Sequence, residues 1–152
     1  MSDAQIDLTL EDLEVGQTFL SEEIALSADE IKAFATQFDP QPFHLNEESA
    51  KNTFFGELVA SGWHTAAITM RFLVSSLKIK GGLVGAGGDI SWLRPTRPGD
   101  SLHAETEVMA INTSRSKPDR GTVKLRTLTK NQAGKTVQIM TCLIVVPRRT
   151  VF

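Results

Sequence analysis

The sequence predicts an α+β protein in which a curled antiparallel β-sheet wraps around one long buried α-helix. Two patterns support this fold class: apolar residues with helical spacing over residues 58–77, and alternation of apolar and polar residues from residue 84 onward. No internal repeat or linker divides the 152 residues. We therefore expect a single domain over residues 1–152, with an irregular lead-in over residues 1–15.

The first half of the chain is expected to contain a strand followed by a short helix. Residues 17–26 form the expected strand. Ser27 has the position of a helix N-cap, because Glu30 follows three residues later as in a capping box. The helix should end before Pro40 and Pro42, since the residue before a proline is disfavoured in helical conformation. Its expected apolar face consists of Ile31, Phe34, Ala35 and Phe38.

The main helix is expected to begin at Ser61-Gly62, after a second short helix that starts near Asn46. Apolar residues recur along it with a period near 3.6, and two more lie on the opposite side. A helix that is apolar nearly all round is typical of a buried helix. The stripe comprises Val59, Trp63, Ala66, Ala67, Met70, Leu73, Val74 and Leu77, with Ile68 and Phe72 opposite.

Four strands are then expected in meander order, with antiparallel pairing because their connections are short. The first contains Ile90 and Trp92 and ends at Pro95. The other three follow the alternating runs, separated by a turn at residues 98–100, a polar loop at 112–121 and a hairpin at 131–135. The alternating runs cover residues 101–110, 123–128 and 137–145.

Composition and charge exclude several classes of partner. The chain has 16 basic and 18 acidic residues, so its net charge of −2 provides no basis for binding nucleic acid or an anionic membrane. An anionic ligand would need a local basic cluster. Residues 58–77 are too polar to span a bilayer. Cys142 is the single cysteine, and the acidic start lacks the pattern of a signal peptide, so we expect a cytoplasmic protein.

The first candidate site is the segment Phe38-Asp39-Pro40-Gln41-Pro42-Phe43-His44. Two prolines keep an acid and an imidazole out of regular helix, so both side chains can point into one pocket. Flanking phenylalanines would make that pocket apolar, which raises the pKa of a carboxyl and lowers that of a histidine. We expect Asp39 and His44 to act as an acid/base pair. The alternative is that Asp39 simply ends a helix and His44 is an ordinary packed or surface histidine.

The second candidate is Gly62, at the start of the apolar helix. The first N–H groups of a helix have no partner within it and lie at the positive end of its dipole. A carbonyl oxygen that becomes negative during a reaction would be stabilised there. The alternative is that glycine serves only tight packing at the helix entry.

These segments resemble the signature of the MaoC-like hydratases, which include the (R)-specific enoyl-CoA hydratases and related dehydratases of the hot-dog fold. The resemblance covers roughly residues 26–146. The matching segments are Asp39-Pro40-Gln41-Pro42-Phe43-His44, Phe55-Gly56, Ala60-Ser61-Gly62, Trp92-Leu93-Arg94-Pro95 and Pro98-Gly99-Asp100. His64 departs from the family, where small apolar residues are common. It either packs within the helix or meets the pocket or a neighbouring subunit.

The resemblance implies a hydratase that reversibly adds water to a 2-enoyl thioester to give the (R)-3-hydroxyacyl thioester. Asp39 and His44 would activate the water and protonate the α-carbon, while the N–H of Gly62 holds the thioester oxygen. It implies no metal and no other cofactor, because the thioester itself acidifies the α-carbon. Further substrate-binding residues are expected to be Pro42, Phe43, Phe55, Ser61, Trp63 and Met70, although Trp63 and Met70 also fit a plain core.

The expected substrate is an acyl-CoA or an acyl-carrier thioester, and scattered basic residues such as Arg94 and Arg97 are candidates for contacting its phosphates. An open sheet edge favours pairing with a second copy, as a homodimer or a dimer of dimers. Two alternatives keep the fold: a non-catalytic module that binds acyl thioesters, and a thioesterase. Residues 58–77 contain no Asp or Glu, which argues against the thioesterase.

Overall fold

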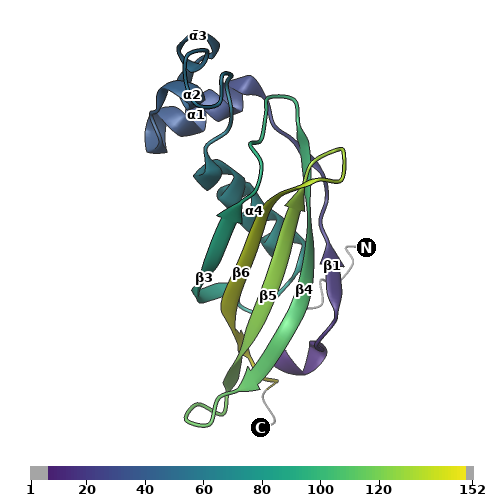
Figure 1. The fold of residues 1–152 in the computed structure, drawn as a ribbon. Helices are drawn as coiled ribbons and strands as arrows, with labels where there is room; N and C mark the ends of the chain where they lie inside the picture. Colours follow the sequence, from purple (N-terminus) through teal and green to yellow (C-terminus); the bar gives the residue numbers. More distant parts are fainter. Residues whose placement is uncertain (1–6, 150–152) are drawn as a thin grey trace, which may run out of the picture.

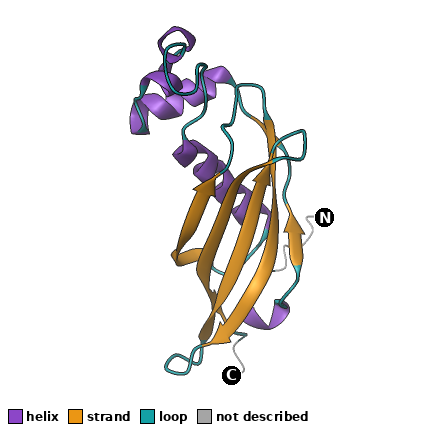
Figure 2. Cartoon of the chain, viewed as in Figure 1, coloured by secondary structure: helices purple, strands orange, loops and turns teal. Residues whose placement is uncertain are grey.

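A six-stranded antiparallel sheet curls around one long helix in the computed structural model, which describes residues 7–149 (Figure 1). The predicted α+β fold class is confirmed. Three short helices gather beyond one end of the sheet (Figure 2). The strand order is β1-β4-β5-β6-β3, and β2 also pairs with β4. The strands are β1 Thr18–Leu20, β2 Ile24–Ala25, β3 Val84–Trp92, β4 Ser101–Thr113, β5 Arg120–Lys130 and β6 Thr136–Pro147.

The core lies between the sheet and the long helix α4 (Gly62–Ser76). Side chains alternate between buried and exposed along β4 and β5, as their period of two predicts. Phe72 of α4 is the largest fully buried side chain among the described residues. In the expected lead-in, residues 10–12 form a short 3-10 helix, and residues 1–6 lie outside the described part of the chain.

Helix α1 (Ala28–Phe38) begins as the capping box at Ser27 predicts. The Ser27 hydroxyl accepts a hydrogen bond from the Glu30 N–H at 3.1 Å, and the Glu30 carboxylate accepts one from the Ser27 N–H at 3.2 Å. Ile31 and Ala35 are buried. Phe38, expected on the same face, is 68% exposed because the last turn of α1 lies beyond the end of the sheet (Figure 1).

The segment expected to be irregular contains a helix. Pro42 begins α2 (Pro42–Leu45), and α3 (Glu47–Ala50) follows with Asn46 as its N-cap. The ring of proline fixes φ at a value suited to the first helical position, where no N–H is needed. His44 therefore lies on a short helix rather than in a loop.

The expected meander is wrong for the strand that precedes residue 95. Strand β3 pairs with β6, not with β4, so the link after β3 crosses the end of the sheet. Pro95 and Pro98 have no N–H to donate to a hairpin ladder. Instead the link is anchored elsewhere, where Thr96 O accepts from the N–H of Ala60 at 2.9 Å.

Two further boundaries differ from the expectation. Residues 17–26 form two short strands, β1 and β2, rather than one, and both pair with β4. The loop expected at residues 112–121 is shorter, because β4 continues to Thr113 and β5 begins at Arg120.

Helix α4 is not enclosed on all sides by its own chain. Trp63, Met70 and Val74 are 59%, 46% and 51% exposed, so part of the apolar stripe faces outward. Thr65 and Thr69 are buried instead. Burial of a hydroxyl requires hydrogen-bond partners, which the distant strands supply in this fold. Among residues 7–149, no helix combines the length and apolarity needed to cross a bilayer.

Candidate active site

The imidazole of His44 is held between a backbone carbonyl and a carboxylate. Its Nδ1 lies 2.7 Å from the carbonyl oxygen of Val59, and its Nε2 lies 3.3 Å from Oδ2 of Asp39. The Val59 N–H in turn donates to the carbonyl oxygen of Phe43 at 2.9 Å, so the two segments are joined on both sides of the ring. Because a carbonyl oxygen can only accept, the proton of a neutral His44 resides on Nδ1. Its Nε2 then presents a lone pair toward Asp39.

Asp39 ends α1 and is joined to the start of α4. Its Oδ2 accepts a 2.6 Å hydrogen bond from the hydroxyl of Ser61, and its Oδ1 accepts one from the side chain of Gln41. Burial by itself raises the pKa of Asp39, but the bonds from Ser61 and Gln41 and the charge of a protonated His44 lower it further than burial raises it. The net direction is downward, opposite to the shift expected for this carboxyl from an apolar pocket. Asp39 is therefore a carboxylate at neutral pH.

Gly62 occupies the first position of α4, after the buried N-cap Ser61. The Ser61 hydroxyl accepts from the N–H of Trp63 at 3.2 Å while donating to Asp39. The N–H of Gly62 has no acceptor among the described residues. This N–H is thus a free donor at the positive end of a 15-residue helix.

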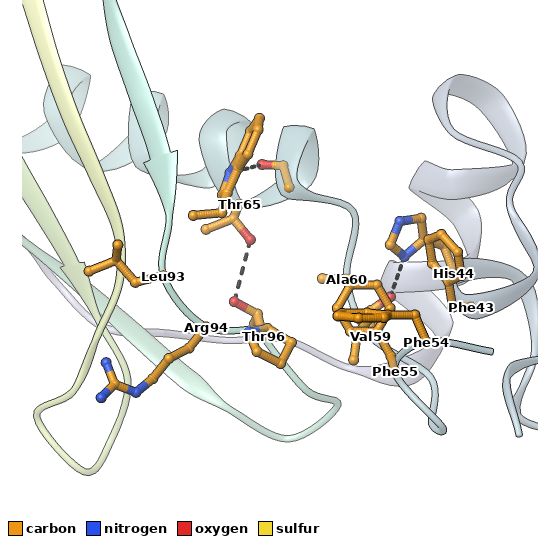
Figure 3. A pocket seen from close by; sticks show the side chains of 13 residues that line it. Phe43, His44, Phe54, Phe55, Val59, Ala60, Thr65, Leu93, Arg94 and Thr96 are labelled. Atoms are coloured by element: carbon orange, nitrogen blue, oxygen red, sulfur yellow. Dashed lines mark hydrogen bonds between the residues drawn. The ribbon is translucent and has the colours of Figure 1, made fainter.

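A cavity of about 500 Å³ joins His44 to Gly62 (Figure 3). Aromatic rings of the short-helix region form one side, and the link after β3 forms the other. Asp39 does not line the cavity, but its Oδ2 lies 3.3 Å from Nε2 of His44, which does. The lining residues are Phe43, His44, Phe54, Phe55, Val59, Ala60, Gly62, Thr65, Trp92, Leu93, Arg94, Pro95 and Thr96.

The cavity includes four of the residues expected at the site: His44, Gly62, Phe43 and Phe55. Asp39 and Ser61 are joined to this group through hydrogen bonds. Pro42, Trp63 and Met70 do not line the cavity.

The three residues outside the cavity have other places in the fold. Pro42 starts α2, and its carbonyl accepts from the hydroxyl of Ser49 at 2.8 Å. Trp63 and Met70 were expected to contact substrate, but α4 directs them to its exposed side and directs Gly62 and Thr65 toward the cavity. Among residues 7–149, no group of three or more His, Cys, Asp or Glu side chains is placed to hold a metal ion.

Trp92 is the main cavity-lining residue that sequence reasoning did not single out. Its indole N–H is 3.0 Å from the carbonyl oxygen of Gly62 and 3.0 Å from Oε1 of Gln138. The ring covers Gly62 so closely that a Cβ at position 62 would lie 2.6 Å from it. Glycine at position 62 therefore allows the indole to pack tightly against the helix start, and its N–H still has no acceptor within residues 7–149. The only signal in the sequence was the position of Trp92 within the resemblance.

His64 packs against α1 instead of lining the cavity. Its ring stacks on Phe34 with a centroid distance of 4.5 Å and an interplanar angle of 5°. Its Nδ1 is buried and has no hydrogen-bond partner within the described part of the chain. Burial lowers the pKa of His64, against the opposing charge of Glu30. The packed alternative for this histidine fits these contacts.

Known proteins resemble this chain in both sequence and fold. The family model described as MaoC like domain matches residues 12–131. A crystal structure of a MaoC-like dehydratase from Rhodospirillum rubrum is 56% identical, with a TM-score of 0.92 over 95% of this chain and 99% of that one. The R-hydratase PhaJ1 from Pseudomonas aeruginosa is 28% identical, with a TM-score of 0.77 over 94% and 88%. A 3-hydroxybutyryl-CoA dehydratase from Methylorubrum extorquens is 32% identical over 68% of this chain and 66% of that protein.

Proposed function

The chain belongs to the MaoC-like domain family of the hot-dog fold, and from that premise we propose that it reversibly adds water to a 2-enoyl thioester, giving the (R)-3-hydroxyacyl thioester. The names of two similar proteins, an R-hydratase and a 3-hydroxybutyryl-CoA dehydratase, support this reaction class. The chain runs the reaction as a single domain, with its acid/base pair and its oxyanion donor both within residues 39–62.

The observation that carries the proposal is the pairing of His44 Nε2 with Asp39 Oδ2 at 3.3 Å beside the cavity. With the proton of His44 on Nδ1 and Asp39 ionised, both of these atoms are acceptors. Two acceptors this close repel each other unless a hydrogen lies between them. A water molecule that donates one hydrogen to each would relieve that repulsion. This is the arrangement that a hydration reaction needs, because the pair would hold the water molecule at His44, which lines the cavity.

In the forward direction the water oxygen bonds to C3 of the enoyl group while the pair accepts one proton from the water. The C2–C3 double bond opens, its electrons move onto the thioester carbonyl, and an enolate forms. The enolate oxygen accepts a hydrogen bond from the free N–H of Gly62. The proton taken from water is returned to C2, so that OH is added at C3 and H at C2. Water and the thioester are the only reactants.

Ser61 and the backbone of Val59 keep the pair in this state. Ser61 donates to Asp39 and lowers its pKa, so the carboxylate stays ready to accept. The Val59 carbonyl fixes the tautomer of His44. Proton transfer by such a pair contributes about 10²–10⁴-fold to the rate.

The proposal includes a homodimer. Strand β3 forms an edge of the sheet and exposes most of its residues, and the outward stripe of α4 is apolar. An unpaired strand edge is a template for pairing with another chain. Light scattering at micromolar concentration is expected to give twice the monomer mass, and a stable monomer would exclude the dimer.

Loss of the enoyl absorbance of crotonyl-CoA tests the reaction directly. Asp39→Asn and His44→Gln are each expected to lower kcat by about 10²–10⁴-fold. Matched controls are Asp29→Asn, an exposed carboxylate on α1, and His103→Gln on β4, which should retain the wild-type rate. A wild-type protein that leaves several enoyl chain lengths unchanged would support the non-catalytic binding module instead. An active Asp39→Asn variant would remove that residue from the mechanism.

A further inference from the structure

A second hollow, of about 360 Å³, lies beside the cavity and is lined by basic side chains. Two segments far apart in the sequence form it: the link after β3 and the turn between β5 and β6. Three of its six lining residues are cations, although the chain as a whole carries a net charge of −2. The lining residues are Arg94, Pro95, Arg97, Asn131, Ala133 and Lys135.

The hollow adjoins the candidate active site, because Arg94 and Pro95 line both spaces. In Figure 3 the side chain of Arg94 lies on the opposite side of the cavity from His44. A ligand whose reactive group reaches His44 can therefore extend past Arg94 into the basic hollow. Such a ligand has to be elongated and has to carry negative charge at the far end.

The walls of the hollow are fixed to each other before any ligand arrives. Arg94 Nη1 donates to the carbonyl oxygen of Thr136 at 3.2 Å, which joins the link to the start of β6. Gln132 donates to Asp100 at 2.9 Å and accepts from the N–H of Ser101 at 3.0 Å. A preformed site loses less entropy when it binds a ligand than a site that must first be ordered.

The hollow offers hydrogen-bond donors in excess of acceptors. Lys135 has no carboxylate within 4 Å in the described part of the chain. Arg97 pairs through Nε with Glu57, which leaves its terminal nitrogens as donors. The side-chain oxygen of Asn131 is occupied by the N–H groups of Ala133 and Lys135, so its amide NH₂ remains as the free group. Cations together with amide donors recognise phosphate oxygens.

We propose that this hollow binds a phosphate group of the pantetheine-based carrier that holds the acyl thioester. The inference rests on the proposed function, because that function places the acyl group beside His44. The carrier arm then extends out of the cavity past Arg94. Phosphate is common to coenzyme A and to the phosphopantetheine arm of an acyl carrier protein.

Lys135 provides the sharpest test, because it is exposed in a turn and does not line the catalytic cavity. The full chain is assayed with crotonyl esters of pantetheine, phosphopantetheine, coenzyme A and acyl carrier protein. Lys135→Gln is expected to lower kcat/KM by about two- to fivefold on the phosphate-bearing esters, through KM, and Lys135→Glu by about tenfold. Crotonyl-pantetheine, which has no phosphate, should be unaffected. Lys124→Gln and Lys124→Glu, at an exposed lysine of β5, are the matched controls.

The pattern across the esters identifies which phosphate is bound. A loss on coenzyme A but not on phosphopantetheine places the nucleotide phosphates in the hollow, and a loss on both places the phosphate nearest the pantetheine there. A loss confined to the carrier-protein ester indicates that the hollow binds the phosphate of the phosphopantetheine arm on that protein. Equal losses on all esters including pantetheine, or no loss on any phosphate-bearing ester, would overturn the proposal.

A binding measurement separates this proposal from the hydration reaction. Calorimetry compares coenzyme A with pantetheine in the wild-type chain and in Lys135→Glu. Tighter binding of coenzyme A that weakens in the variant supports the phosphate site even if no enoyl ester is hydrated. Coenzyme A that binds no more tightly than pantetheine, or equally well in both proteins, overturns it.

Discussion

Replacing Gly62 with alanine is the most informative single change, because it links packing, stability and the proposed oxyanion donor. The added Cβ would lie 2.6 Å from Cε2 and 2.9 Å from Cδ2 and Nε1 of the Trp92 indole. The ring therefore has to move, and its N–H loses the bonds to the carbonyl of Gly62 and to Gln138. The substitution thus disturbs a single contact, between residue 62 and the indole of Trp92.

The size of the effect follows from three contributions. Overpacking costs about 1–3 kcal/mol, and each lost hydrogen bond removes about 0.5–1.5 kcal/mol of net stability. Alanine is favoured over glycine in a helix interior by about 1 kcal/mol, which is the upper limit of the offset at the first position of α4. Trp92 is 44% exposed, so its ring can swing outward and relieve the clash. We expect Gly62→Ala to lower the free energy of unfolding by about 1–2 kcal/mol.

A double-mutant cycle with Trp92→Ala isolates the contact. Without the indole, Gly62→Ala should be neutral or should stabilise the protein by up to about 1 kcal/mol, which gives a coupling energy of about 1–3 kcal/mol. Urea unfolding followed by far-UV circular dichroism measures all four proteins at one fixed concentration, since a dimer's stability depends on concentration. The same loss in both backgrounds would refute the clash as its cause. In the hydration assay Gly62→Ala should lower kcat at least about tenfold, because the added Cβ and the displaced indole crowd the space beside the N–H that would hold the enolate oxygen.

Three further predictions test neighbouring parts of the structure. Ser61→Ala removes a bond that lowers the pKa of Asp39, so the acidic limb of the pH profile of kcat/KM should move to higher pH, and loss of the N-cap should lower the free energy of unfolding by about 0.5–2 kcal/mol; an unmoved limb would contradict this. Burial lowers the pKa of His64 from 6.5, so the unfolded chain binds that proton more tightly and stability falls as the pH drops below 6.5. His64→Phe should therefore show a smaller difference than wild type between urea midpoints at about pH 7.5 and about pH 5, and an equal difference would assign the pH dependence to other groups. Phe72→Ala, at a side chain with 0% exposure, should lower the free energy of unfolding by about 3–5 kcal/mol, whereas Phe54→Ala, at 94% exposure, should change it by less than about 0.5 kcal/mol.

Local signals in the sequence were sufficient for the starts of α1 and α4 and for the three long strands β4, β5 and β6, but not for α2. The capping box at Ser27 occurs where its spacing predicts, and α4 begins at the expected Ser61-Gly62. These features depend on residues within one turn of each other. The partner of β3 depends instead on β6, about fifty residues later, and no local pattern distinguishes β6 from β4 as its neighbour.

The orientation of α4 could not be predicted because its buried face contains two threonines beside Phe72 and Leu73. Thr69 is fully buried, and its hydroxyl lies 2.6 Å from that of Thr129 and accepts from Gln138 at 2.9 Å. Apolar periodicity assigns threonine to the exposed side, since it cannot include partners supplied by distant strands. The outward position of Trp63 and Met70 was not predicted for the same reason, because the buried threonines turn these two residues to the exposed side.

For the site, the prolines between Asp39 and His44 indicated that the two side chains could approach each other, but their contact at 3.3 Å is known only from the structure. The other half of the cavity was not predictable, because Trp92, Arg94 and Thr96 reach it through the link that crosses the end of the sheet. Their contribution depends on the unexpected strand order. The net direction of the pKa of Asp39 was also beyond the sequence, since it depends on the bond from Ser61, twenty-two residues away.

The carbonyl of Val59 makes the proposed tautomer of His44 insensitive to the side chain at position 59. Histidine tautomers in many proteins are selected by a carboxylate side chain, which a single nucleotide change can remove. Here the selecting atom belongs to the main chain, and every amino acid at position 59 would carry it. The segment around that atom is also held by main-chain bonds, from the N–H of Val59 to Phe43 and from the N–H of Ala60 to Thr96. Ordinary missense changes at position 59 can alter packing, but they leave the atom that selects the tautomer of His44 in place.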